Sequence, residues 1–303
     1  MKRLLDCETS DLKIMTKQEK LDSIEASEGR ITIQEISLFG GMQLLEGISD
    51  AEVACAFGAD MILLNAFDVY HPHIGAIDCE EKDVIKTLKK YTGRLIGVNL
   101  EPVSDEKVLG ERSNISKGRC ASVETAKKAI ELGFDFILLT GNPGTGVTND
   151  KIIEVMSEIN EACGDELIIM AGKMHAAGSK SEGGNNIITK QNVEDFKKAG
   201  ANVILLPAPG TVPGITLDYA TSIVEEIHKQ GVLALSAIGT SQEGASPETI
   251  RQIALMCKMT GVDIHHIGDA AIGGLDPISL LEYNIAIKGK RHTYKRMARS
   301  INR

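Results

Sequence analysis

The chain has 303 residues, of which 43% are hydrophobic and 25% charged, as in an ordinary globular protein with a large core. Its formal net charge of −9 argues against a nucleic-acid partner, because binding a phosphate backbone needs a concentrated basic surface. No stretch approaches the roughly 18 apolar residues of a membrane span, and the first residues lack the apolar segment of a signal peptide, so we expect a cytoplasmic protein with no membrane partner.

Eight apolar runs of β-strand character follow one another from residue 31 onward, separated by stretches of helical periodicity. In chain order they are ITIQEISLF, MILLNAF, RLIGVNLEPV, FILLTG, LIIMAGKM, VILLPAPG, VLALSAIG and IHHIGDA. Before them, residues 1–30 predict one or two short helices that cover the N-terminal face of the domain. We therefore expect a helical extension over residues 1–30 and one domain over residues 31–303.

A glycine stands one or three residues before seven of these runs, where it would end the preceding helix. The glycines recur every 30 to 40 residues, the length of one βα unit, at Gly58, Gly93, Gly133, Gly164, Gly200, Gly231 and Gly261. A finer repeat, Gly-x-Asp or Gly-x-Asn, marks only the even-numbered runs. Alternate strands of a closed barrel supply alternate interior layers, so the repeat predicts a (βα)8 TIM barrel. An open doubly wound sheet is the alternative, and it gives no reason for the even-strand rule.

Three further segments have unusual composition. The stretch from Lys288 to Arg303 is basic and contains no acidic residue, so we interpret it as a solvated helix end or, alternatively, as a subunit contact in a homo-oligomer. Residues 103–121 and 176–189 are long for loops after strands, and the Gly, Ser and Asn content of the second predicts a mobile lid.

The fifth run ends in Lys173 and His175, whose spacing of two puts both on one face of a strand. If that face is the interior, a desolvated lysine can act as a base or form an imine with a carbonyl. The alternative is a lysine in the start of the loop, neutralised by a carboxylate. The third run ends in Asn99 and Glu101, whose spacing of two also puts both on one face of a strand. Four roles are open for Glu101: the carboxylate partner of Lys173, a general base, a metal ligand, or a polar residue at the rim of the barrel.

The eighth run carries His265 and His266 where the other even-numbered runs have leucines. One of the two must face the barrel interior. If the alternation of side chains matches that of Asn65 and Thr140 at the ends of the second and fourth runs, His265 and Asp269 face the interior. A core histidine with satisfied hydrogen bonds is the alternative.

Phosphate is often bound in barrels by the glycine-bearing loops after strands seven and eight, where backbone N–H groups meet the anion. The residues predicted to do so here are Gly239, Thr240, Ser241, Gly268, Gly273 and Gly274. A rival cradle spans residues 141–146 after the fourth run, and it lacks the Lys-Ser/Thr of a nucleotide-binding loop.

Over residues 31–287 the repeat and these loops resemble the phosphate-binding barrels, the superfamily of ribulose-phosphate-binding and related sugar-phosphate enzymes. The stretches IGTSQEGASPETIRQIALM, HHIGDAAIGG and KRHTYKRMARS are also similar to a bacterial barrel family loosely named phosphonomutase-like or haloacid dehalogenase-like. A haloacid dehalogenase needs an N-terminal strand that ends in DxD, and this sequence has none. A phosphonomutase needs a cluster of acidic residues to bind magnesium, and here only Asp68 and Glu101 stand at the corresponding strand ends. No catalytic residue carries over from a family.

We therefore expect an enzyme for a small phosphorylated sugar or keto acid, either an aldolase-type lyase or an isomerase or epimerase. Lys173 would be its nucleophile or base, and His175 and Glu101 would transfer protons. The sequence assigns no cofactor to this chemistry, with magnesium left as an alternative, and six cysteines without a CxxC pair predict neither a zinc site nor disulfides.

Two alternatives stay open. One is a metal-assisted enzyme for a phosphonate or phosphate ester, with magnesium on Glu101, Asp68 and either His265 or Asp269. The other is a regulatory barrel that binds a phosphosugar without catalysis.

Overall fold

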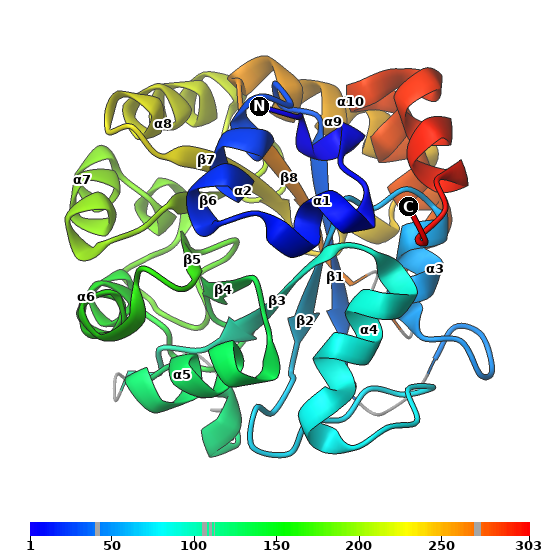
Figure 1. The fold of residues 1–303 in the computed structure, drawn as a ribbon. Helices are drawn as coiled ribbons and strands as arrows, with labels where there is room; N and C mark the ends of the chain where they lie inside the picture. Colours follow the sequence, from blue (N-terminus) through cyan, green and yellow to red (C-terminus); the bar gives the residue numbers. More distant parts are fainter. Residues whose placement is uncertain (40–42, 105–107, 109–110, 112, 270–273) are drawn as a thin grey trace.

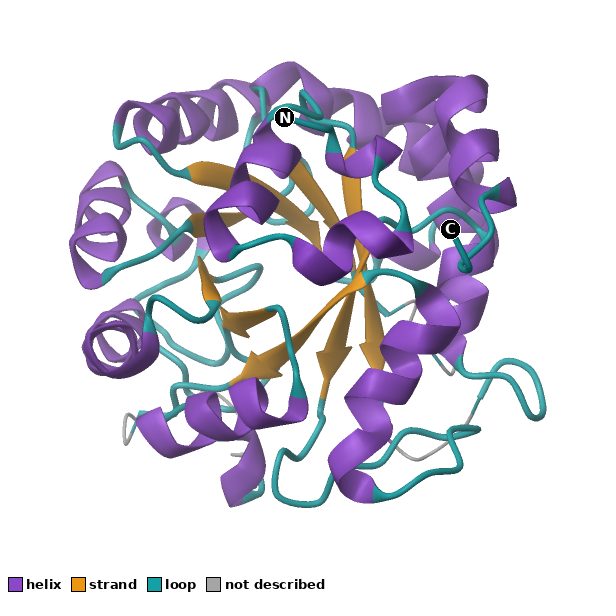
Figure 2. Ribbon diagram, viewed as in Figure 1, coloured by secondary structure: helices purple, strands orange, loops and turns teal. Residues whose placement is uncertain are grey.

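A computed structural model describes residues 1–39, 43–104, 108, 111, 113–269 and 274–303. Eight parallel strands close into a barrel in sequence order, with β1 paired to both β2 and β8. Helices surround this ring of strands (Figures 1 and 2). The predicted (βα)8 barrel is confirmed.

Each strand lies within one of the apolar runs. The strands are β1 (Ile31–Ser37), β2 (Met61–Asn65), β3 (Leu95–Leu100), β4 (Phe136–Leu139), β5 (Ile168–Gly172), β6 (Val203–Pro207), β7 (Leu233–Ile238) and β8 (Ile264–Ile267). The α-helices are α1 (Thr9–Ile14), α2 (Lys17–Glu25), α3 (Asp50–Ala56), α4 (Val84–Thr92), α5 (Val123–Leu132), α6 (Asn149–Cys163), α7 (Lys190–Ala199), α8 (Leu217–Lys229), α9 (Pro247–Thr260) and α10 (Pro277–Ala298). None of the helices in these described ranges is long and apolar enough to cross a membrane.

Six of the seven helix-ending glycines have a positive φ, as the repeat predicts. Gly133 is typical: its φ of 94° lets its N–H close the last turn of α5 before the chain reverses into β4. Gly164 is the exception, with a φ of −60° in the right-handed region. The turn there continues through Asp165 and Glu166, where the N–H of Glu166 donates to the backbone oxygen of Cys163 at 3.1 Å.

The Gly-x-Asp/Asn repeat links strands in pairs. At each even strand the Asp or Asn side chain accepts a hydrogen bond from the backbone N–H of the second residue of the preceding odd strand. The four bonds are Thr32 to Asp60 (3.0 Å), Ile96 to Asp135 (2.9 Å), Ile169 to Asn202 (2.9 Å) and Ala234 to Asp263 (2.8 Å). The repeat therefore reflects hydrogen bonds between neighbouring strands at the N-terminal end of the barrel. It does not reflect the layers of the barrel interior, which were the reason given for it from the sequence.

The N-terminal extension covers that same end of the barrel. Leu4, Leu12 and Ile24 of the extension belong to one apolar cluster with the interior-facing barrel residues Ile33 and Leu95. Figure 1 shows α1 and α2 in front of the strands on this face. The extension thus closes the interior from the N-terminal side, and the C-terminal ends of the strands stay available for a site.

The basic C-terminal segment is in part a core element. Lys288 and Arg296 are only 6% and 1% exposed, and both contact the carboxylate of Asp60. Arg299 donates to the backbone oxygens of Asp6 and Cys7 in the extension. The interpretation of this segment as a solvated helix end is therefore correct only in part: Lys290, Arg291, Lys295 and Arg303 are exposed, whereas Lys288 and Arg296 are buried.

Candidate active site

A cavity of about 270 Å³ opens at the C-terminal ends of the strands, the end where TIM-barrel active sites lie. We call it the mouth pocket. It is lined by Glu35, Phe39, Asn65, Asn99, Thr140, Gly141, Asn142, Pro143, Met174, His175, Gly239, Ser241, Glu243, Gly268 and Asp269. None of these lining residues from the described part of the chain is a lysine or arginine, and three are carboxylic acids.

Glu35 on β1 and His266 on β8 form a buried pair in the mouth pocket's wall. The Nε2 atom of His266 lies 2.9 Å from Oε2 of Glu35, and Asn65 donates to Oε1 at 2.8 Å. Burial acts to raise the pKa of Glu35, but the hydrogen bond and charge of His266, with the bond from Asn65, bring that pKa below its ordinary value. Glu35 is therefore ionised at neutral pH and fixed at both oxygens.

Three asparagines from different strand ends form a hydrogen-bonded group beside this pair. Asn99 donates to Oδ1 of Asn65 at 3.0 Å, and Asn65 donates to Oδ1 of Asn142 at 2.8 Å. Oδ1 of Asn99 and Oγ1 of Thr140 are buried and have no hydrogen-bond partner within the described ranges. Both residues line the pocket, but these two oxygens are themselves shielded from it, so a substrate hydroxyl group could reach them only after a side-chain rotation.

Glu101 stands behind the asparagines and does not line the pocket. Arg119 donates to its Oε1 at 2.6 Å, and the backbone N–H of Asn142 donates to its Oε2 at 2.9 Å. Its carboxylate therefore holds the loop after β4, including Asn142, in place. The ion pair with Arg119 was not anticipated from the sequence, which suggested Lys173 as the partner.

His175 lines the pocket from the loop after β5. Burial and the nearby charge of Lys173 lower the pKa of His175 to about 4, with Glu35 acting in the opposite direction. Its Nδ1 accepts the N–H of Ala177 at 3.0 Å. The imidazole is therefore neutral at pH 7 with its proton on Nε2, and Nε2 is a hydrogen-bond donor.

Glu243 and Asp269 line the side of the pocket formed by the loops after β7 and β8. Burial raises the pKa of Glu243, and the negative charge of Asp269 adds to this effect. Burial likewise raises the pKa of Asp269, with the charge of Glu35 adding to it. The Oε2 atom of Glu243 is buried and, in the part of the chain that the structure describes, has no partner. The pocket thus contains one stabilised carboxylate and two carboxyl groups that favour protonation.

The predicted phosphate loops meet the pocket only in part. Gly239, Ser241 and Gly268 line it, whereas the Thr240 hydroxyl donates to the backbone oxygen of Thr211 at 2.8 Å. Gly274 lies beside Asp50 and is not a lining residue, and Gly273 falls outside the described residues. The backbone N–H groups of Ser241 and Glu243 act to lower the pKa of the Glu243 carboxyl group, against the effect of burial. Phosphate binding at these loops stays a prediction, and an anion there would compete with Glu243.

Lys173 does not converge with His175, and that prediction is wrong. Interior-facing residues of this segment are Met170 and Met174, so Lys173 lies on the outer side of the barrel. Its ammonium group donates to the backbone oxygens of Val147 at 3.0 Å and Ala176 at 3.2 Å, and it also contacts the Glu182 carboxylate. The alternative from the sequence, a loop lysine neutralised by a carboxylate, matches this geometry.

Glu182 also bears on the lid prediction, because it lies within residues 176–189. Its carboxylate accepts the N–H of Asn149 at the start of α6, and Tyr219 of α8 donates to the backbone oxygens of Asn185 and Ile188. These contacts anchor the segment to two helices. A lid that moves over substrate would have to break them.

The prediction that His265 faces the interior is also wrong. His265 stands four residues after its repeat glycine Gly261, whereas Asn65 stands seven after Gly58, so the two have opposite parity along a strand. The residue that shares the parity of Asn65 is His266, five after Gly261. Correct counting from the glycine would have selected His266 from the sequence alone.

His265 is a core residue, and its burial should make the fold sensitive to acid. Its two ring nitrogens lie 3.0 Å from the hydroxyl of Tyr283 and 3.2 Å from the backbone oxygen of Gly29, and burial lowers its pKa to about 3. The unfolded chain therefore binds a proton that the folded chain does not. Stability from this residue should fall by about 2–3 kcal/mol as the pH drops from 6.5 to 4.

The measurement is urea unfolding at several pH values. His265→Gln should flatten the acid slope even if its stability at pH 7 is lower, whereas His71→Gln, at an exposed position, should leave the slope unchanged. Equal slopes in all three proteins would refute this account of His265.

The proposed magnesium ligands are not brought together. His265 points away from the pocket, Glu101 is paired with Arg119, and Asp68 accepts the N–H of Tyr70 at 2.8 Å. Within the described ranges there is no group of three or more His, Cys, Asp or Glu side chains placed to hold a metal ion.

No curated protein matches the sequence. Among solved structures, the carboxyl transferase domain of Rhizobium etli pyruvate carboxylase with pyruvate is 13% identical, with a TM-score of 0.53, and the match covers 97% of this chain and 52% of that one. The same domain with oxamate and biotin is 14% identical, with a TM-score of 0.52, and the match covers 94% and 51%. This chain thus spans about half the length of these structures.

A thiamine phosphate pyrophosphorylase from Pyrococcus furiosus is 14% identical, with a TM-score of 0.48 over 89% of this chain and 98% of that one, too low a score to support an argument. At such identities the similarity to solved structures is one of fold alone. The family assignment comes from the sequence itself, since residues 5–303 match the family described as "Domain of unknown function (DUF7916)", and the chain belongs to that family.

Proposed function

We propose that this protein is an enzyme that moves protons on a small, hydroxyl-bearing carbonyl compound, a sugar or a keto acid, in the manner of an isomerase, an epimerase or a lyase. The observation that carries the proposal is the contrast among the three carboxyl groups of the mouth pocket. The pKa of Glu35 is lowered, and those of Glu243 and Asp269 are raised. Acidic groups whose environments differ in this way are suited to separate roles as base and acid.

Glu35 is the proposed base. It is ionised, and His266 and Asn65 hold its two oxygens in a fixed orientation. A carboxylate in this state can take the proton from the carbon next to a carbonyl group, and His266 stabilises it between turnovers. The second proton, which the substrate oxygen needs, would come from Asp269 or Glu243.

His175 is proposed to polarise the carbonyl group. Its Nδ1 is occupied by the N–H of Ala177, so the neutral ring presents the Nε2 proton as donor. A donor aimed at the carbonyl oxygen stabilises the negative charge that develops there when Glu35 removes the proton. After a side-chain rotation that exposes them, the unpartnered oxygens of Asn99 and Thr140 would accept hydrogen bonds from the hydroxyl groups of the same substrate.

If the substrate carries a phosphate group, we propose that it binds at the loops with Gly239, Ser241 and Gly268, which line the mouth pocket. Small residues allow the backbone to approach an anion closely. The carboxyl group of Glu243 must first be protonated or move, because it lines the pocket beside Ser241 and its negative charge would repel the anion. We therefore expect phosphorylated substrates to bind better as the pH falls.

Exchange of substrate hydrogen with solvent tests the proposal without knowledge of the net reaction. The protein is incubated in D₂O with a panel of aldoses, ketoses and keto acids, each free and as its phosphate ester, and the substrates are followed by proton NMR. We expect loss of the signal from the hydrogen next to the carbonyl for at least one compound. A panel in which no compound exchanges faster than with the Glu35→Gln protein would contradict the proposal.

A further inference from the structure

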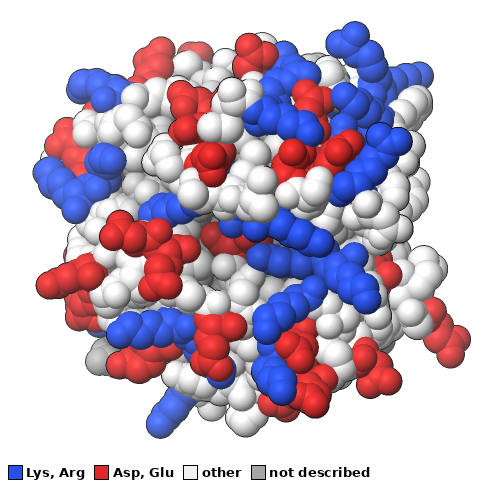
Figure 3. Space-filling model, viewed as in Figure 1, with Lys and Arg blue, Asp and Glu red and all other residues white. Residues whose placement is uncertain are grey.

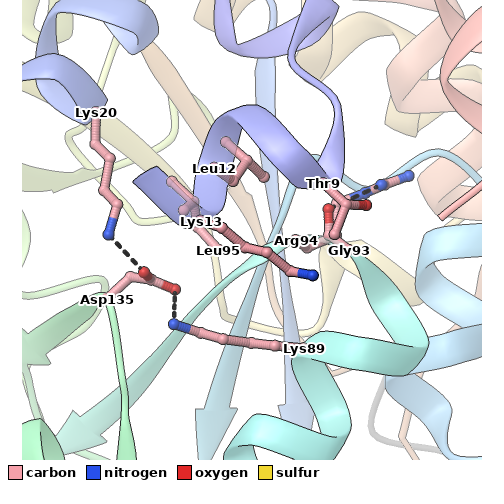
Figure 4. Close-up of a pocket in the computed structure, with 9 residues that line it drawn as sticks. All are labelled: Thr9, Leu12, Lys13, Lys20, Lys89, Gly93, Arg94, Leu95 and Asp135. Atoms are coloured by element: carbon pink, nitrogen blue, oxygen red, sulfur yellow. Dashed lines mark hydrogen bonds and ion pairs between the residues drawn. The ribbon is translucent and has the colours of Figure 1, made fainter. Parts of the chain in front are cut away.

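A second cavity, of about 250 Å³, lies at the opposite end of the barrel from the mouth pocket. Its walls come from α1 and α2 of the extension, the end of α4, and the residues that begin β3 and precede β4. Figure 4 shows the extension lying over this cavity. We call it the base pocket. Nothing in the proposed reaction uses it.

Lysine and arginine dominate the charge of the base pocket. Lys13, Lys20, Lys89 and Arg94 line it, against the single carboxylate of Asp135. This excess is unusual in a chain with a net charge of −9. Figure 3 shows a band of Lys and Arg side chains crossing the middle of this face of the molecule. Like charges around a concave surface create a positive potential that attracts anions.

Asp135 cannot neutralise all of these cations, because its oxygens are already used. Lys20 contacts Oδ1 at 2.7 Å, and Lys89 contacts Oδ2 at 2.7 Å (Figure 4). The backbone N–H of Ile96 also donates to Oδ2, at 2.9 Å. Two ammonium groups thus share one carboxylate, and each keeps donors for a second acceptor.

Lys13 lacks even a shared partner. No ion pair or hydrogen bond of its ammonium group is found among the described residues, and its side chain extends across the cavity from α1 (Figure 4). Arg94 also lines the cavity and adds positive charge, although its own N–H groups donate to backbone oxygens, including that of Ala59 at 2.8 Å. In Figure 4 the ammonium groups of Lys20 and Lys89 point toward Asp135, and that of Lys13 points toward the Gly93 and Arg94 side of the same cavity, so the positive charge of the pocket is not balanced.

We infer that the base pocket binds the phosphate group of a small metabolite, with Lys13, Lys20 and Lys89 as its ligands. The apolar side chains of Leu12 and Leu95 line the same cavity and can contact the carbon part of such a molecule. A phosphate held there joins α1 and α2 to α4. Binding should therefore stabilise the extension against the barrel, separately from catalysis at the mouth pocket.

Calorimetric titration with inorganic phosphate and with glycerol phosphate, at constant ionic strength, tests this inference. Lys13→Met removes a cation without breaking an observed ion pair, and Lys90→Met removes an exposed lysine from α4 outside the pocket. We expect Lys13→Met to raise the Kd at least about tenfold and Lys90→Met to change it less than about twofold. Tighter binding of glycerol phosphate than of phosphate would identify an organic phosphate as the ligand, and the reverse order would identify the free ion.

Hydrogen exchange supplies the second measurement. Phosphate should slow amide exchange in residues 9–25 of the wild-type protein and of Glu35→Gln, but not of Lys13→Met. Equal Kd values for the wild type, Lys13→Met and Lys90→Met would overturn the inference. So would phosphate protection confined to the loops after β7 and β8, which would place the anion in the mouth pocket.

Discussion

Replacing Glu35 with glutamine should slow exchange of substrate hydrogen with D₂O by about 10²–10⁴-fold, the usual contribution of a positioned general base. Glutamine preserves the size of the side chain and can still bond to Asn65, so the pocket should keep its shape. It cannot take a proton from carbon. The control is Glu225→Gln, which removes an exposed carboxylate from α8 and should leave the rate unchanged. A Glu35→Gln protein that exchanges at the wild-type rate would exclude Glu35 as the base.

The pH dependence of the same exchange separates this mechanism from one based on lysine. The rate should fall at low pH, as Glu35 becomes protonated below the ordinary pKa of a glutamate, and at high pH, as Asp269 and Glu243 lose their protons above the ordinary range. We therefore expect a bell-shaped profile with its optimum on the acid side of neutrality. An optimum above pH 8 would instead indicate an amine as the base.

The fold could be predicted from the sequence because its signals are local and repeated. Glycines that end helices and apolar runs that follow them recur with the period of a βα unit, and short-range physics is enough to interpret both. The Gly-x-Asp/Asn repeat identified the even strands correctly. Its explanation needed the structure, since the bond from Thr32 to Asp60 joins residues 28 positions apart.

The site could be predicted only for residues within a strand, where side chains alternate between the interior and the exterior of the barrel. Asn99 of β3 lines the pocket as its parity predicts, and the interior histidine of β8 follows from counting to His266, whereas Glu101 follows the end of β3 and does not line the pocket. Beyond the strand ends parity fails. The strand β5 ends at Gly172, so Lys173 and His175 no longer alternate as in a strand, and only His175 reaches the pocket.

Glu243 was missed for a different reason. It lies in a short 3-10 helix, Gln242–Gly244, after β7, and nothing in the sequence QEG distinguishes a buried carboxyl group from an exposed one. Gly268 of the neighbouring loop lies against it, since a Cβ atom at Gly268 would approach its Oε1 to 3.1 Å. Such a contact between two loops is a product of the closed barrel and leaves no local signal.

Asp60 should be the acidic residue on which stability depends most. Its carboxylate lies 2.5 Å from Nζ of Lys288 and 2.9 Å from Nε of Arg296, and all three side chains are buried. Burial acts to raise the pKa of Asp60, but the two cations bring it below its ordinary value, so it is ionised when folded. Asp60→Asn keeps an acceptor for the N–H of Thr32 and leaves two buried cations without a counter-charge. We expect it to lower the free energy of unfolding by about 3–5 kcal/mol.

The repeat itself supplies the matched control. Asp263→Asn keeps the equivalent bond, to the N–H of Ala234, and its charged partner His228 has a side chain 42% exposed, so the loss should stay below about 1 kcal/mol. Urea unfolding of both variants at pH 7 measures the difference. The deficit of Asp60→Asn should also shrink as the pH rises, since burial lowers the pKa of Lys288 and deprotonation removes one unpaired charge. Equal losses in the two variants would show that the shared backbone bond, and not the buried charge, is what Asp60 contributes.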